Sequence, residues 1–223
     1  MKYCMVIIDG FPDRPYQRIK NKTPIEAARV PNMDRVSMQG RMGMVKTIPD
    51  GFPADSVVST MSVLGYDPVM YYTSRAGFEA EAMEIELAEN DWVLCGEFVS
   101  TFDGCLIDPC AGKIRTEESR VLLEDLSDHF QKRSVQFYRI KNHHHLMVLR
   151  NVSLKDVKTY DPTYIIGQPL GKYYPAGEGS ELLVEILEEG KKILVDHEVN
   201  KVRRDLGEDR KSTRLNSSHV SHS

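Results

Sequence analysis

The chain lacks any long apolar segment. No stretch approaches the roughly 20 apolar residues that a membrane-spanning helix needs. The first apolar run ends after about five residues at Asp9, which is too short for a secretion signal. We therefore expect a cytoplasmic protein with no membrane partner.

Cysteine is also scarce, and no two cysteines form a CxxC pair. The 223 residues contain four cysteines, which are Cys4, Cys95, Cys105 and Cys110. We expect all four to be reduced thiols, as is usual in the cytosol. A zinc site made of Cys95, Cys105 and Cys110 is an alternative, although structural zinc sites usually take closely spaced pairs of ligands.

An excess of basic charge is missing as well. The formal net charge is −4, and the last thirteen residues carry two basic and no acidic groups, so the remainder carries −6. A nucleic-acid-binding protein needs a basic surface, so we expect no nucleic-acid partner. The composition, 41% hydrophobic and 28% charged, is typical of a globular protein with one large or two small domains.

An apolar strand is predicted at the N-terminus, and it leads directly into an aspartate. Residues 4–8 are Cys-Met-Val-Ile-Ile, a pattern typical of a buried strand in a parallel sheet. Open α/β sheets bind ligands at the carboxyl ends of their strands, so Asp9 is a candidate metal ligand or catalytic group. The alternative is a turn residue that closes the strand.

Ser56 is the best candidate nucleophile. It precedes a helical pattern whose apolar face is Val57, Met61 and Leu64 and which ends at Gly65. A hydroxyl among the N–H groups of a helix N-terminus suits phosphoryl transfer, and a bound divalent metal would make its alkoxide accessible near neutral pH. The alternative is that Ser56 only caps the helix.

Further side chains are candidates for binding a phosphorylated acid. Arg75 lies in a predicted loop of small residues, where it would either bind a phosphate or stay a surface group. Residues 143–145 are histidines on a predicted strand, and neighbours on a strand face opposite ways, so one inward histidine is favoured over a shared metal. Arg14 follows the first strand and is a candidate for positioning the substrate.

The chain before residue 85 has the pattern of a mixed α/β domain. Thr23 and Glu26 predict a capping box at the start of a helix, and Gly40 ends a second helix over 33–39. Strands are predicted over 41–48 and 83–87 by their apolar patterns.

A different pattern follows, in which short strands surround one acidic helix. The strands are predicted at 92–100, 106–108, 135–140 and 145–149, the helix at 116–130, and an amphipathic helix follows a connector at 180–197.

We divide the chain into four parts on these patterns. Residues 1–84 are predicted to form the N-terminal part of a core domain, 85–177 an inserted α+β domain, and 178–210 a helix that returns to the core. Residues 211–223 show no periodicity and a sudden Ser/His bias, and we interpret them as an artefactual tail with no part in the fold.

Several motifs, in order, resemble the cofactor-independent phosphoglycerate mutases of archaeal type. The matching segments are Ile-Ile-Asp-Gly at 7–10, Asp-Arg-Pro at 13–15, and those at 22–28, 31–35, 45–53, 64–68, 167–169, 177–181 and 197–201. The similarity covers residues 1–210. That family belongs to the alkaline-phosphatase-like metalloenzymes. The resemblance therefore implies an α/β fold with an incomplete alkaline-phosphatase-like sheet domain and an inserted α+β domain.

The resemblance also implies a glycolytic and gluconeogenic isomerase that moves phosphate between the 3- and 2-positions of glycerate through a phosphoserine. It implies two divalent metal ions (Mn, Mg or Zn), with Asp9 as a ligand, Ser56 as ligand and nucleophile, and Arg75 and His145 as substrate-binding residues. The family's remaining Asp and His ligands match no part of this chain. We therefore expect a truncated chain that is inactive alone.

The chain departs from the family pattern around the predicted substrate site. The family's Pro-Gly-Ser-Asp-Val-Ala-Asn segment is Ala-Asp-Ser-Val-Val-Ser-Thr at 54–60, and His144 stands where an arginine is expected. Two alternatives follow. One is a related phosphotransferase with another substrate, and the other is a non-catalytic homologue that binds a phosphorylated ligand or a partner.

Overall fold

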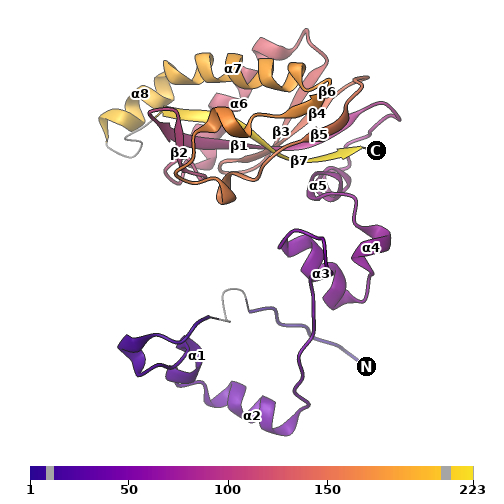
Figure 1. Cartoon of the computed structure of the whole chain (residues 1–223), viewed down its shortest axis with the longest axis vertical. Helices are drawn as coiled ribbons and strands as arrows, with labels where there is room; N and C mark the ends of the chain where they lie inside the picture. Colours follow the sequence, from indigo (N-terminus) through magenta and orange to yellow (C-terminus); the bar gives the residue numbers. More distant parts are fainter. Residues whose placement is uncertain (9–12, 207–211, 223) are drawn as a thin grey trace. The chain divides into compact units, whose positions relative to one another are not determined.

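The structure, a computed structural model, describes residues 1–8, 13–206 and 212–222, with the backbone alone for the last segment (Figure 1). It divides into two compact units, Met1–Phe52 and Pro53–Ser223. Among the described residues, no helix is both long and apolar enough to cross a membrane.

The first unit contains three short helices, η1 (Gln17–Ile19), α1 (Pro24–Ala27) and α2 (Pro31–Gln39). The predicted capping box is confirmed, since the Thr23 hydroxyl accepts from the Glu26 N–H and the Glu26 carboxylate accepts from the Thr23 N–H. No residue of the three helices is buried. Proline occupies the first turn of α1 and α2, and the capping box stabilises α1, so these two helices depend on local signals and not on a core.

The two strands predicted in this unit are wrong. Residues 1–8 and 41–47 have no regular secondary structure, and Val6 and Ile7 are 75% and 62% exposed. A parallel strand is stable only between neighbouring strands, and the described residues of this unit provide no such partner. Asp9 itself lies outside the described residues.

The second unit begins with α3 (Ser56–Leu64), α4 (Pro68–Tyr71) and α5 (Arg75–Ala82). Gly65 ends α3 as predicted, with a left-handed φ of 89°. Helix α5 replaces the predicted loop because the Ser74 hydroxyl accepts from the Gly77 N–H and caps it.

The strand predicted over 83–87 is also wrong, because residues 85–88 have no regular secondary structure. Ile85 and Leu87 instead pack at the margin of an apolar cluster under α5.

An antiparallel sheet in the order β2-β1-β4-β3 forms the centre of this unit. Its strands are β1 (Trp92–Phe102), β2 (Cys105–Asp108), β3 (Val135–Lys141) and β4 (His144–Leu149), which confirms the four predicted strands within a few residues. A separate two-stranded sheet joins β5 (Lys155–Lys158) and β6 (Ala176–Glu178), and η2 (Pro162–Tyr164) and η3 (Leu170–Tyr173) lie between them in sequence.

The C-terminal tail joins the sheet, although the sequence predicts no structure for it. Strand β7 (Ser212–His222) pairs antiparallel with Trp92–Thr101, on the edge of β1 opposite β4. That edge of β1 would otherwise present unpaired N–H and C=O groups, with which any strand-forming segment can pair. The artefactual origin of the tail stays a prediction.

Two helices cover one face of the sheet and α5 covers the other (Figure 1). Helix α6 (Thr116–Phe130) has the predicted bounds, and α7 (Glu181–Val195) is followed by α8 (Glu198–Asp205). Because α7 packs on the same sheet as α6, Pro53–Ser223 forms one unit here. The boundaries near residues 84 and 177 stay predictions for a longer protein.

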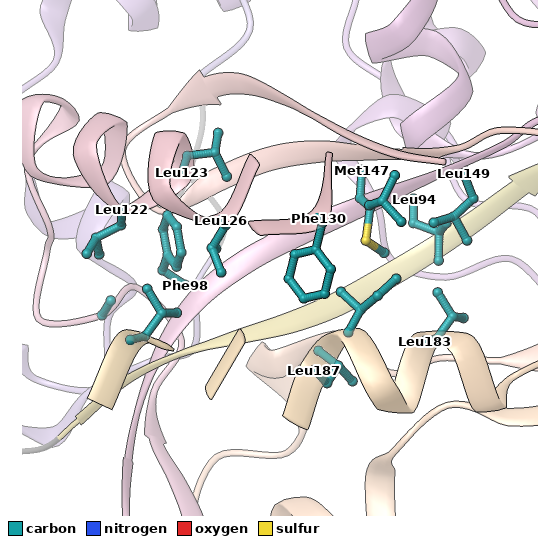
Figure 2. Close-up of a cluster of buried hydrophobic side chains, with 14 of the residues drawn as sticks. Leu94, Phe98, Leu122, Leu123, Leu126, Phe130, Met147, Leu149, Leu183 and Leu187 are labelled. Carbon is teal, nitrogen blue, oxygen red and sulfur yellow. The ribbon is translucent and has the colours of Figure 1, made fainter. Parts of the chain in front are cut away.

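The main core lies between the sheet and these two helices (Figure 2). Its largest members include Leu94, Phe98, Leu126, Phe130, Met147, Leu149, Leu183 and Leu187. On the α5 side, a smaller cluster contains Ala76, Ala80, Val93, Cys95, Leu146 and Val148. A third cluster consists of Val99, Leu106, Ile165 and Leu170.

Candidate functional site

Ser56 is the first residue of α3, and it is exposed. The capping residue is Asp55, whose Oδ1 accepts from the Val57 N–H at 2.6 Å. The interpretation of Ser56 as a simple cap is therefore wrong, because the neighbouring carboxylate already performs that function. The hydroxyl of Ser56 is therefore not needed to cap the helix N-terminus.

Ser56 lines a groove of about 720 Å³ on the second unit. The other lining residues, most of them apolar or aromatic, are Val57, Thr60, Met61, Leu64, Tyr66, Tyr71 and Phe78. The groove is lined mainly by residues of α3, α4 and α5, and Ser56, the predicted nucleophile, is one of them.

Arg75 lies at the start of α5, not in a loop, and its Nε donates to Glu79 Oε1 at 2.8 Å. The two residues are one helical turn apart, a spacing that favours such pairs. Burial alone would lower the pKa of Arg75, but Glu79, Cys95 and Asp55 raise it.

Glu79 also contacts the sheet through its second carboxylate oxygen. Its Oε2 accepts from His144 Nε2 at 2.8 Å, and His144 Nδ1 lies 3.5 Å from Glu97 Oε1. Burial alone would lower the pKa of His144, but the two carboxylates raise it to about 9, so the ring is a cation at neutral pH. The Glu79 pKa is lowered overall, because His144 and Arg75 outweigh its burial. Four alternating charges thus connect α5 to the sheet.

His145 faces the opposite side of the sheet, as the predicted alternation of neighbouring histidines requires. It is 1% exposed, its ring centroid lies 4.9 Å from that of Phe98, and neither ring nitrogen has a hydrogen-bond partner among the described residues. Burial lowers the pKa of His145 to about 3, so the ring is neutral. Its role as a substrate ligand stays a prediction.

The two remaining predicted site residues belong to the first unit. Arg14 is exposed in the first unit, where its backbone N–H donates to Asp13 Oδ1. Asp9 lies outside the described residues.

Sequence reasoning missed Glu79, Glu97 and Cys95 as neighbours of His144. Two spacings carried a signal: Arg75 and Glu79 are four residues apart on a helix, and Cys95 and Glu97 alternate on a strand. Neither spacing shows that the helix and the strand meet, so the cluster itself was not predictable from these patterns.

The cysteine-based zinc site is not supported. Within the part of the chain that the structure describes, one group of at least three Cys, His or acidic ligands lies close enough to hold a metal ion. That group is Glu79, Cys95 and His144, and it excludes Cys105 and Cys110.

The described residues near Ser56 do not make a site for two divalent ions. Two such ions need several carboxylate or imidazole ligands, and the one carboxylate beside Ser56, that of Asp55, is engaged in capping α3.

The sheet covered by helices places this chain in a known class of α/β fold. It is similar to the cofactor-independent phosphoglycerate mutase from Thermoplasma acidophilum, at 27% identity and a TM-score of 0.59 over 97% of this chain and 58% of that one. The PH0037 protein from Pyrococcus horikoshii shares the fold at 23% identity and a TM-score of 0.61, over 96% of this chain and 49% of that one. The class is the alkaline-phosphatase-like fold.

The family follows from the sequence comparison. The family model described as 2,3-bisphosphoglycerate-independent phosphoglycerate mutase matches residues 38–200. The enzyme of that name from Methanosarcina mazei is 37% identical over 207 residues, which is 93% of this chain and 52% of the relative. The chain belongs to the 2,3-bisphosphoglycerate-independent phosphoglycerate mutase family. It spans about half the length of the curated relatives it matches.

Proposed function

We propose that the whole protein interconverts 3-phosphoglycerate and 2-phosphoglycerate through a phosphate carried on Ser56, and that the 223-residue chain alone does not turn over. The observation that carries this proposal is the position of Ser56 at the exposed first residue of α3, with capping performed by Asp55. The hydroxyl is accessible, and the first-turn dipole favours a bound phosphate.

Most of the other roles in this proposal follow the family resemblance. Arg75 and His145 bind the phosphorylated acid, and Asp9 and Ser56 bind two divalent ions (Mn, Mg or Zn) together with ligands outside this chain. Arg14, chosen for its place after the predicted first strand, also binds the acid. When bound, such ions would favour the alkoxide of the serine. The proposed location is the cytoplasm, with no membrane or nucleic-acid partner.

The test is the phosphoserine itself. The complete gene product, supplied with Mn²⁺ and labelled 3-phosphoglycerate, should give a phosphopeptide containing residue 56 and should form 2-phosphoglycerate. Ser56→Ala should remove the phosphopeptide and lower the rate at least about a thousandfold, as expected for a lost nucleophile.

Ser59→Ala is the matched control, because Ser59 lies one turn along the same helix and its hydroxyl donates only to the Ser56 carbonyl among the described contacts. It should leave the phosphopeptide and the rate unchanged. Full activity of Ser56→Ala would refute the phosphoserine. Detectable interconversion by the 223-residue chain would refute its predicted inactivity.

A non-catalytic binder is the second candidate, and the departure of residues 54–60 from the family pattern around the serine favours it. Calorimetry of the complete protein with 3-phosphoglycerate separates the two functions. Binding that survives metal removal, without turnover, supports the binder. Arg75→Gln should weaken binding at least about tenfold, since a charge-assisted contact is lost. The control Arg120→Gln, which alters a similar Arg–Glu pair on α6, should not weaken it.

A further inference from the structure

Three side chains of different chemistry converge between α5 and the sheet. They are Glu79 from α5, Cys95 from β1 and His144 from β4, and their ligand atoms all lie within 4.8 Å of one another. We propose that this trio binds one zinc-class transition metal ion, separate from the two divalent ions proposed at the phosphoserine site.

The distances are close to those of a tetrahedral site. Zinc bonds of about 2.0–2.3 Å place neighbouring ligand atoms roughly 3.3–3.8 Å apart. Glu79 Oε2 lies 2.8 Å from His144 Nε2 and 3.6 Å from Cys95 Sγ. An ion therefore requires the Glu79–His144 contact to open by about 0.5 Å. The carboxylate has this freedom because it is the least buried of the three ligands.

A second ring of contacts orients the ligands. Glu97 Oε1 lies 3.5 Å from His144 Nδ1, which leaves Nε2 directed at Glu79 and the proposed ion. This is the carboxylate–histidine–metal arrangement that fixes the orientation of a metal-bound imidazole. Arg75 holds the other oxygen of Glu79, Oε1, so Oε2 remains for the ion. Each of these two ligands thus has its non-ligating atom engaged by a charged neighbour.

The charge of the cluster also accommodates the ion. Without metal, His144 donates a proton to Glu79, and the buried Cys95 thiol donates to the same oxygen. A divalent ion would take the place of these two protons, so the net charge of the buried cluster would not change. The large cost of burying an uncompensated charge is thereby avoided.

The ligand types select the metal. A thiolate and an imidazole favour zinc and similar transition metals over Mg²⁺, Ca²⁺ or Mn²⁺, which prefer sets of oxygen ligands. Three protein ligands leave a fourth position, to be filled by water or another small donor. The oxygen-rich family site proposed around Asp9 and Ser56 would not give a thiolate signal, so the two sites are distinguishable.

Cobalt titration of the 223-residue chain tests the proposal, since Co²⁺ replaces zinc and reports thiolate coordination by an ultraviolet charge-transfer absorption. We expect one Co²⁺ per chain, this absorption, and its loss when Zn²⁺ is added. The absorption should persist in the triple variant Cys4→Ser, Cys105→Ser, Cys110→Ser, which keeps Cys95 as the one cysteine. Cys95→Ser should abolish it.

Two further variants refine the assignment. His144→Gln should abolish tight binding, and Glu97→Gln should weaken it about 10–100-fold, as expected when the partner of a metal-bound histidine is lost. The control His129→Gln alters a histidine–carboxylate pair that joins α6 to Glu189 of α7, and this variant should bind Co²⁺ as the unaltered chain does. A wild-type chain without the thiolate absorption, or its loss in the triple variant, would overturn the proposal. Neither outcome depends on whether Cys95→Ser folds.

Discussion

The two faces of the central sheet are built from the same strands but differ in chemistry. Beneath α6 and α7, alternate residues of β1 and β4 bury leucine, phenylalanine and methionine side chains (Figure 2). Beneath α5, the intervening positions carry Cys95, Glu97 and His144, which meet Glu79 and Arg75. One face is apolar and almost fully buried, whereas the other adds to its smaller apolar cluster a set of charges that is partly exposed, from 9% at His144 to 37% at Arg75.

This difference indicates that the apolar face stabilises the fold and that the α5 face is available for chemistry. Apolar area removed from water contributes roughly 25 cal/mol per Å², whereas a buried ion pair often contributes little net stability because of its desolvation cost. Breaking such a pair is nevertheless costly, because one charge is left buried alone. The three predictions below test this contrast, from the largest expected effect to the smallest.

Phe130→Ala should be the most damaging change on the apolar face. The side chain is fully buried between α6, α7 and the sheet, so its removal leaves a cavity in the main core. We expect a loss of about 3–5 kcal/mol in the free energy of unfolding, measured by urea denaturation of the 223-residue chain. Phe102→Ala is the control, because Phe102 is 62% exposed on β1. A loss below about 1 kcal/mol for Phe130→Ala would contradict the assigned core.

Asp91→Asn tests the ion pair between Asp91 and Arg150. Asp91 lies in the segment that connects α5 to β1, directly before the first residue of β1. Asp91 accepts from the N–H groups of Ala88 and Asn151, both at 2.9 Å, and from Arg150 Nη1 at 2.6 Å. The side chain is 5% exposed. Leaving Arg150 without its charged partner should cost about 2–4 kcal/mol at neutral pH.

The pH dependence of this variant has a definite sign. Burial alone would raise the pKa of Asp91, but the bonds from Ala88, Arg150 and Asn151 lower it below the ordinary 3.8. The carboxylate therefore stabilises the fold above pH 3.8, and this contribution is lost as the pH falls toward the lower folded pKa. Urea denaturation should show the gap between wild type and Asp91→Asn narrowing in that range. A gap that is independent of pH would refute the ionic role, and Asp128→Asn, at an exposed position of α6, is the control.

Features of the fold that are encoded locally could be predicted from the sequence. The Thr23–Glu26 capping box, the glycine stop at Gly65 and the bounds of α6 all depend on residues within a few positions of one another. The strands predicted over 4–8 and 41–48 failed because a strand depends on partners, and the described part of the first unit provides none.

In the candidate site, too, the locally encoded feature was predictable and the long-range contact was not. The opposite facing of His144 and His145 follows from the two-residue period of a strand, and the structure confirms it. The contact of His144 with Glu79 joins residues 65 positions apart, and it depends on how α5 packs across the sheet. No local pattern contains that information. The motifs identified the family, but they did not show which of the altered residues touch each other.

Gly96→Ala tests whether a change on the apolar face of the sheet leaves the α5 face unaffected. Gly96 pairs with His145 across β1 and β4. A Cβ at residue 96 would lie 2.3 Å from His145 Nε2 and 2.7 Å from its Cδ2, and the ring is enclosed beside Phe98. We expect a loss of about 1–3 kcal/mol in urea denaturation, from overpacking on the apolar face alone. Gly171→Ala, where a Cβ meets nothing within 4 Å, should change stability by less than about 0.5 kcal/mol. Because the displaced ring points away from α5, cobalt binding should survive in Gly96→Ala. Wild-type stability of this variant would show that His145 is not confined against the strand, and its burial could then no longer explain a neutral ring.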